Sequence, residues 1–139
     1  MNGSKVTYTQ PKALIEELSS VLVVDVRDDD FEGGNIANAA NYRSKSFKVD
    51  ESVREELVHK VIDCKVKKVV FHCMASKERG PTCARAFEAT MDRVLATQFP
   101  GSDTSIEVSV LQGGYSAFSS TYLDTHPHLF ANTAHHPKR

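Results

Sequence analysis

The sequence predicts an α/β domain in which helices flank a parallel β-sheet, and two observations support this. Segments in which apolar residues recur with helical spacing alternate along the chain with short β-branched segments. The β-branched segments are apolar enough to be covered on both faces, as the strands of parallel sheets are. Because ligands of such sheets bind beyond the carboxyl ends of the strands, we expect a functional site there.

The length and composition are those of one folded domain. At 139 residues, with 40% hydrophobic and 25% charged residues, the chain can bury a core without disulfides or metal ions. We therefore expect a single domain over residues 1–139. A formal net charge of -1 provides no long-range field that would attract nucleic acid or an anionic membrane. We expect neither as a partner, and we expect a monomer.

The first half of the chain contains two predicted helices and one strong strand. Residues 11–18 begin with proline, which suits the first helical position, and their apolar residues have helical spacing. Residues 21–27, VLVVDVR, predict a buried strand. After an acidic turn, residues 35–43 predict a short extended piece. A helix over residues 50–63 is predicted from the spacing of Val53, Leu57, Val58 and Val61.

The second half repeats the alternation. Residues 67–72, KKVVFH, predict a strand, and residues 81–99 predict the longest helix. Residues 106–111, IEVSVL, predict the last strand, which Gly113 and Gly114 close in a turn. The end of the chain, from about residue 126, is predicted to be loosely held.

One loop carries a reactive group where the fold predicts a site. Cys73 directly follows the strand at residues 67–72, and a Gly-Pro pair then opens a helix. The loop consists of seven residues: Cys73, Met74, Ala75, Ser76, Lys77, Glu78 and Arg79. If the backbone N–H groups of residues 74–79 point inward, they form a cradle for a tetrahedral oxyanion beside the positive end of the helix. Arg79 can clasp two oxygens of that anion with its planar guanidinium.

The chemistry that suits this loop is covalent transfer through Cys73. The positive surroundings favour its thiolate, which attacks phosphorus, releases an alcohol or phenol and leaves a cysteinyl phosphate for water to hydrolyse. Glu78 is the candidate general acid for the leaving oxygen, although it could instead face solvent or balance Lys77. Ser76 either bonds the sulfur or shapes the turn. We expect His72 to orient the loop through backbone carbonyls. The alternative for Cys73 is a buried thiol that fills a core.

Two further groups of side chains are of types that can bind metal ions, but their spacing along the chain does not match a known metal site. The turn after residues 21–27 is crowded with acidic residues, namely Asp28, Asp29, Asp30 and Glu32. We favour a solvated turn there, with Asp25 or Glu32 holding Arg27, over a cation site. Histidines gather near the end of the chain, at His126, His128, His135 and His136. Their spacing fits no closed zinc motif, so we expect no metal.

The sequence shows no sign of secretion or membrane insertion. The first residues lack the apolar run of a signal peptide, and no window approaches the roughly 18 apolar residues of a spanning helix. Three cysteines, Cys64, Cys73 and Cys83, form no disulfide framework. We expect an intracellular protein, in the cytoplasm, the nucleus or both, with reduced thiols.

The loop HCMASKERGP resembles the active-site signature of the cell-division-cycle dual-specificity phosphatases, in which His-Cys, five residues and Arg-Gly-Pro follow one another. It is also similar to the loop of the eukaryotic arsenate reductases built on the same fold. Upstream, VVDVRDDDFEGGNIANAANY resembles the strand and Gly-Gly box of rhodanese-like domains, and VLQGGYSAF resembles their last strand and turn. The resemblance spans roughly residues 21–118 and implies a rhodanese-like three-layer α/β/α fold with a five-stranded parallel sheet.

Within this superfamily the resemblance implies that loop length separates the chemistries. Sulfurtransferases have a loop one residue shorter, whereas seven residues fit phosphate or arsenate. We therefore expect a cysteine-dependent protein tyrosine or dual-specificity phosphatase that needs no cofactor and acts on a phosphorylated protein or a small phosphate. The alternative is an arsenate reductase with glutathione or another thiol as co-substrate. A thiosulfate sulfurtransferase and a non-catalytic rhodanese-like binding module are less favoured.

The sequence departs from the family pattern at several positions. Asn35 stands where the Gly-Gly box has histidine, which a turn should tolerate. Val26 stands where the large cell-cycle phosphatases have a second cysteine that protects the nucleophile. Cys83 is then the candidate redox partner of Cys73, with Cys64 as the other substitute, and two packing cysteines are the alternative. The sequence shows no long N-terminal regulatory segment, and we therefore expect it to resemble the small stand-alone fungal or plant members of the group.

Overall fold

A five-stranded sheet runs through the middle of the computed structural model, which describes residues 5–31, 33–101 and 105–133. Every strand pairing in this sheet is parallel. The spatial order of the strands is β1 (Thr7–Thr9), β6 (Glu107–Leu111), β5 (Lys68–His72), β2 (Leu22–Asp25) and β4 (Ala40–Asn41). The predicted five-stranded parallel sheet is therefore confirmed.

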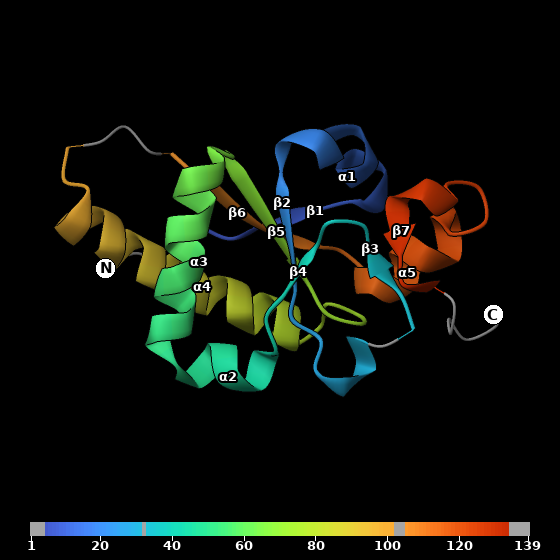
Figure 1. The fold of residues 1–139 in the computed structure, drawn as a ribbon, viewed down its shortest axis with the longest axis horizontal. Coiled ribbons are helices and arrows are strands. Elements are labelled where there is room, and N and C mark those ends of the chain that lie inside the picture. The colour runs from blue at the N-terminus through green and yellow to red at the C-terminus, as the bar shows by residue number, and fades with distance from the viewer. Residues whose placement is uncertain (1–4, 32, 102–104, 134–139) are drawn as a thin grey trace.

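Helices cover both faces of the sheet (Figure 1). The helices on one face are α2 (Ser44–Val49), α3 (Glu51–Cys64) and α4 (Arg79–Gln98), and those on the other are α1 (Pro11–Glu17) and α5 (Gly114–Tyr122). This arrangement confirms the three-layer α/β/α architecture. Because parallel strands need crossover connections, consecutive strands of the central sheet are joined through these helices and loops.

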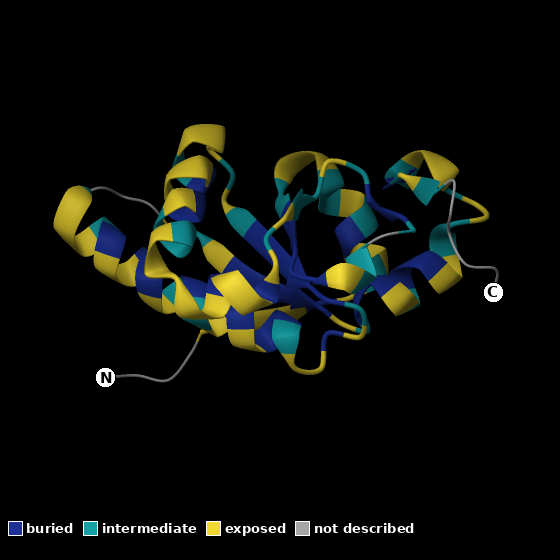
Figure 2. Cartoon of the chain, turned by 60° about the horizontal axis from the view of Figure 1, so that its bottom comes forward, coloured by how far each residue is buried: buried dark blue, intermediate teal, exposed yellow. Residues whose placement is uncertain are grey.

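The side chains of β5 divide between two hydrophobic cores. Val69 and Phe71 are fully buried in the core beneath α2, α3 and α4, whereas Val70 is buried in the core beneath α1 and α5. Alternation of this kind follows from the two-residue period of a strand that is covered on both faces. Figure 2 shows the buried residues concentrated along the strands and on the inner faces of the helices.

The part of the tail that the structure describes is packed against the domain. Strand β7 (Phe130–Ala131) follows the short helix η3 (Pro127–Leu129) and pairs antiparallel with β3 (Asn35–Ile36). Phe130 is only 8% exposed. The prediction of a loosely held end is therefore wrong for residues 126–133, because an apolar side chain and a strand pairing hold this segment. Residues 134–139, with His135 and His136, lie outside the described residues.

The structure also shows what the buried Asn35 does. Its Nδ2 donates to the carbonyl of Ile36 at 2.8 Å, and its Oδ1 accepts a hydrogen bond from Asn132 Nδ2 at 2.9 Å. Asn35 thus ties β3 to Asn132, the residue that follows β7.

Several short elements were not predicted from the sequence, and one long helix begins earlier than predicted. Strand β1 has three residues, too few for a periodic signal. Helix α2 has six residues and is held by Phe47, whose fully buried ring lies 5.8 Å from that of Phe71. The two short 3-10 turns at Leu18–Ser20 (η1) and Asp29–Phe31 (η2) are equally local features.

Helix α4 begins at Arg79, two residues before the predicted start at Pro81. Proline lacks an N–H group and fits anywhere in the first helical turn, where N–H groups have no partner within the helix, so Pro81 did not mark the first position. Arg79 therefore belongs to the helix and not to the end of the loop. No helix among the described residues is long and apolar enough to cross a membrane.

Candidate active site

Cys73 lies where the sequence placed it, immediately after β5 and at the carboxyl edge of the sheet. Its side chain is 3% exposed, and its sulfur accepts hydrogen bonds from the backbone N–H groups of Ser76, at 3.1 Å, and Gly80, at 3.3 Å. Two N–H donors directed at one sulfur stabilise negative charge on it, and Gly80 lies in the first turn of α4. This environment suits a thiolate nucleophile.

The loop after Cys73 turns sharply at Ser76, whose φ of 57° lies in the left-handed region. The Ser76 hydroxyl accepts a weak hydrogen bond from the Cys73 N–H at 3.4 Å, and it is the Ser76 backbone N–H that reaches the sulfur. The turn-shaping interpretation of the Ser76 hydroxyl is therefore the one that the geometry supports. Within the described residues, the other loop N–H groups, those of Met74, Ala75, Lys77, Glu78 and Arg79, have no acceptor in the protein, so they are available to an oxyanion.

Arg79 is bound by the acidic turn that follows β2. Its Nη1 and Nη2 donate to the two carboxylate oxygens of Asp30 at 2.9 and 2.7 Å, and Nη1 also donates to Asp28 at 3.3 Å. The hydrogen bonds from Arg79 hold the pKa of Asp30 below its usual value. The same contacts, those to Asp30 above all, raise the pKa of Arg79, so this ion pair persists at neutral pH.

Asp28 is a fixed part of this network. It is 8% exposed, and its carboxylate accepts hydrogen bonds from the Ser44 hydroxyl at 2.6 Å and from the Lys45 N–H at 3.2 Å. Burial acts to raise the pKa of Asp28, but these hydrogen bonds and those from Arg79 outweigh burial and leave the pKa below its usual value. The prediction of a solvated acidic turn is therefore wrong for Asp28, which is buried, whereas Asp30 is 34% exposed and binds Arg79.

A second ion pair lies beneath the loop. The guanidinium of Arg27, 1% exposed, donates to both carboxylate oxygens of the fully buried Asp25 at distances of 2.7 and 3.0 Å. Arg27 also donates to the carbonyl of Gly34 at 2.8 Å and stacks over the ring of Tyr115 at 4.1 Å. Asp25 is therefore the partner of Arg27, which confirms one of the two predicted alternatives. The other candidate partner, Glu32, lies outside the described residues.

His72 supports the loop from below, as predicted. It is fully buried, and burial lowers its pKa, so the ring is neutral. Its Nδ1 lies 3.0 Å from the carbonyl oxygen of Cys73. Because a carbonyl can only accept, the proton of the neutral ring must reside on Nδ1.

The start of α5 fixes the same backbone from the other side. The N–H of Tyr115 donates to the Cys73 carbonyl at 3.0 Å, and the N–H of Ser116 donates to the Met74 carbonyl at 2.8 Å. This approach requires glycine at position 114, since a Cβ there would lie 2.5 Å from the carbonyl oxygen of Met74. The Gly-Gly turn that the sequence singled out therefore positions the start of the cysteine loop.

The remaining predicted residues lie apart from this network. Glu78 and Lys77 are exposed, and Glu78 makes no side-chain hydrogen bond that caps α4. Cys83 is fully buried, and burial raises its pKa to about 12, so it is a thiol at neutral pH. Cys64 is exposed. No group of three His, Cys, Asp or Glu side chains in the described ranges could hold a metal ion.

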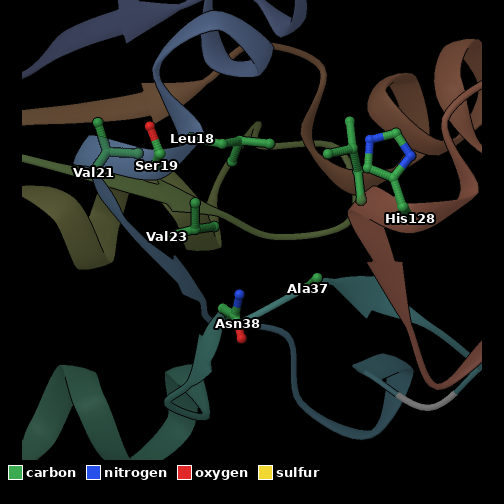
Figure 3. Close-up of a pocket in the computed structure, with 8 residues that line it drawn as sticks. Leu18, Ser19, Val21, Val23, Ala37, Asn38 and His128 are labelled. Atoms are coloured by element: carbon green, nitrogen blue, oxygen red, sulfur yellow. The ribbon is translucent and has the colours of Figure 1, made fainter.

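Two hollows on the surface differ in their relation to the loop. One, of about 540 Å³, adjoins it and is lined by Tyr8, Ala75, Ser76, Lys77, Gln112 and Gly113. The other, of about 250 Å³, lies around the start of β2, and its lining includes Leu18, Val21 and His128 (Figure 3). The second hollow contains none of the predicted site residues, so the site chemistry belongs to the loop.

Residues 7–121 match the family model of the rhodanese-like domain, and the chain therefore belongs to the rhodanese-like family. It is 32% identical over 107 residues to the CDC25-like phosphatase YCH1 of Saccharomyces cerevisiae, covering 73% of this chain and 68% of the yeast protein.

Two solved structures extend the comparison. The As-Sb reductase from Leishmania major is 32% identical, with a TM-score of 0.77 over 91% of this chain and 85% of that one. The yeast protein tyrosine phosphatase Ygr203w, of the rhodanese family, is 27% identical, with a TM-score of 0.76 over 94% of this chain and 95% of that one. Relatives of this chain thus carry the names of two enzyme activities.

Proposed function

We propose that this protein is a cysteine-dependent phosphatase in which Cys73 is the nucleophile and Arg79 binds the phosphate. The observation that carries the proposal is the pair of backbone N–H groups, from Ser76 and Gly80, directed at the buried Cys73 sulfur. A buried thiol that merely filled a core would not need two hydrogen-bond donors, and the loop above it offers further unpaired N–H groups.

The proposed reaction has two steps. The Cys73 thiolate attacks phosphorus, an S–P bond forms, and the P–O bond to the alcohol or phenol breaks. The leaving oxygen takes a proton, for which Glu78 is the candidate donor. Water then attacks the cysteinyl phosphate, which releases inorganic phosphate and restores the thiolate. Neither step needs a cofactor.

The second candidate function is arsenate reduction, which the likeness to the As-Sb reductase of Leishmania major favours. There the Cys73 thiolate displaces one oxygen of arsenate, as water, to form an S–As bond. An external thiol such as glutathione then attacks the Cys73 sulfur, the S–As bond breaks with its electron pair going to arsenic, and arsenite leaves as a mixed disulfide forms. A second external thiol reduces this disulfide and restores the Cys73 thiolate. Cys83 suits the attacking role less well because it is protonated at neutral pH.

Three parallel assays separate these functions. The purified chain is offered an aryl phosphate, arsenate with glutathione, and thiosulfate with cyanide, each beside Cys73→Ser. We expect turnover of the aryl phosphate and its loss in Cys73→Ser. Turnover of arsenate alone would favour the second candidate, and turnover in Cys73→Ser would contradict the role of the cysteine in either one. The substrate that gives the highest kcat/KM decides between the two functions.

A further inference from the structure

The guanidinium of Arg79 is held along one edge and left open along another. Nη1 donates to both Asp30 and Asp28, and one hydrogen of Nη2 is directed at Asp30. Nε makes no hydrogen bond to any described residue. The Nε–H and the second N–H of Nη2 lie parallel on the same edge of the planar group. An oxyanion can therefore bind two parallel donors there without displacing Asp30.

The carboxylates of Asp28 and Asp30 are held in place by other groups of the protein. Asp28 is fixed by the Ser44 hydroxyl and the Lys45 N–H at the start of α2, at 2.6 and 3.2 Å. Its own N–H donates to the Asp30 carboxylate at 2.9 Å. The turn after β2 therefore holds the Asp30 carboxylate ready to accept two hydrogen bonds from Arg79. These contacts fix the shape of the turn without a ligand.

Arg79 immediately precedes Gly80, whose N–H donates to the Cys73 sulfur at 3.3 Å, and the two carboxylates fix the Arg79 guanidinium before a ligand arrives. An unrestrained arginine would lose rotameric freedom when it bound the anion, and a guanidinium already fixed by two carboxylates loses far less.

We propose that Asp30, supported by Asp28, is a positioning residue that aligns Arg79 for the oxyanion. This inference rests on the proposed function, because it supposes that the loop binds phosphate or arsenate. It assigns a role to the acidic turn, which acts through Arg79 without contacting the anion.

The test compares three single substitutions in the same turn of the full chain. Binding of inorganic phosphate and of tungstate is measured by titration calorimetry, together with kcat/KM for an aryl phosphate. We expect Asp30→Asn to weaken anion binding about tenfold or more, as the loss of a charge-assisted hydrogen bond does. Asp28→Asn should act in the same direction. Asp29→Asn, the matched control, should stay within about twofold, because Asp29 is exposed and pairs with Arg43.

A double substitution separates positioning from a general effect on the fold. In Arg79→Lys, which lacks the planar fork, Asp30→Asn should change anion binding by less than about twofold. Binding by Asp30→Asn as tight as that of the wild type, or tighter, would overturn the inference, since the carboxylate would then compete with the anion. Equal losses in Asp29→Asn and Asp30→Asn would also overturn it.

Failure of the proposed function has a different signature. If the wild type bound neither phosphate nor tungstate, the proposed function would fail, and the positioning role would fail with it. If the wild type bound them and Arg79→Lys weakened binding while Asp30→Asn did not, only the positioning role would fail.

Discussion

Arg79 and Asp30, 49 residues apart in the chain, join through two parallel hydrogen bonds of 2.9 and 2.7 Å. The pair links the first turn of α4 to the turn that follows β2. The orientation of Arg79 therefore depends on a second segment at the edge of the sheet, one that is separate from the cysteine loop. The loop alone therefore does not define the candidate site, which also includes the acidic turn.

Glu78 provides a test of how the leaving group is protonated. It is exposed at the start of α4, on the solvent side of the loop. If it donates the proton, Glu78→Gln should reduce kcat/KM at least about tenfold for phenyl phosphate, a poor leaving group, and far less for p-nitrophenyl phosphate. The ratio of the two rates is the measurement. An equal loss on both substrates would remove Glu78 from that role, and the neighbouring Lys77→Gln is the control.

The elements with long, regular patterns could be predicted from the sequence. Helices α3 and α4 and strands β2, β5 and β6 all begin and end within two residues of the predicted bounds. Strand β1 and helix α2 could not be predicted, because three and six residues carry too little periodicity. Tertiary contacts stabilise them, such as the packing of Phe47 on Phe71.

Gly114 should be intolerant of a side chain. Its φ is 63°, and a Cβ would lie 2.5 and 2.6 Å from the carbonyl oxygens of Met74 and Cys73. We expect Gly114→Ala to lower the free energy of unfolding by about 2 kcal/mol or more and to displace the loop, with loss of activity. Urea denaturation and kcat/KM measure the two effects.

A matched control for this prediction is Gly101→Ala. Gly101 has a similar φ of 78°, but a Cβ there would meet nothing within 4 Å. The substitution should therefore carry only the backbone strain, about 1 kcal/mol, and leave activity intact. Equal effects of the two substitutions would show that the close approach of α5 to the loop is unimportant.

The buried His72 predicts a pH dependence of stability. Its pKa is lowered from 6.5 by burial, so below about pH 6.5 the unfolded chain binds a proton that the folded chain does not. The free energy of unfolding should therefore fall as pH decreases from 7 to 5, with a slope of up to about 1.4 kcal/mol per pH unit. The lowered pKa values of Asp28 and Asp30 act in a separate window, below about pH 4, where their protonation removes stability.

Urea denaturation at several pH values measures this slope. His72→Asn keeps an N–H donor near the Cys73 carbonyl and should flatten the dependence between pH 5 and 7. His59→Gln, at an exposed histidine, should leave it unchanged. A resonance of His72 that titrated near pH 6.5 in the folded wild type would contradict the prediction.

Only part of the candidate site could be predicted, because some of its features are local in the sequence and others depend on contacts between distant segments. Cys73 and the loop length are local features of the sequence. The partners of Arg79 depend on where the turn after β2 lies relative to α4, and no spacing along the chain reports that distance. The four acidic residues in the turn gave a signal, but a cluster of carboxylates is equally typical of a solvated surface.

The buried pair of Asp25 and Arg27 gives a prediction about stability. Asp25→Asn would preserve the shape of the side chain but leave a guanidinium that is 1% exposed without its counter-ion. Because an uncompensated buried charge is strongly destabilising, we expect the free energy of unfolding to fall by about 3 to 5 kcal/mol.

The exposed pair of Asp29 and Arg43 has the same N–O distance, 2.7 Å, so Asp29→Asn tests the part played by burial. Its unfolding midpoint in urea should match the wild type within error, because solvent screens an exposed pair. Similar midpoints for the two variants would mean that the support beneath the cysteine loop does not rest on this ion pair.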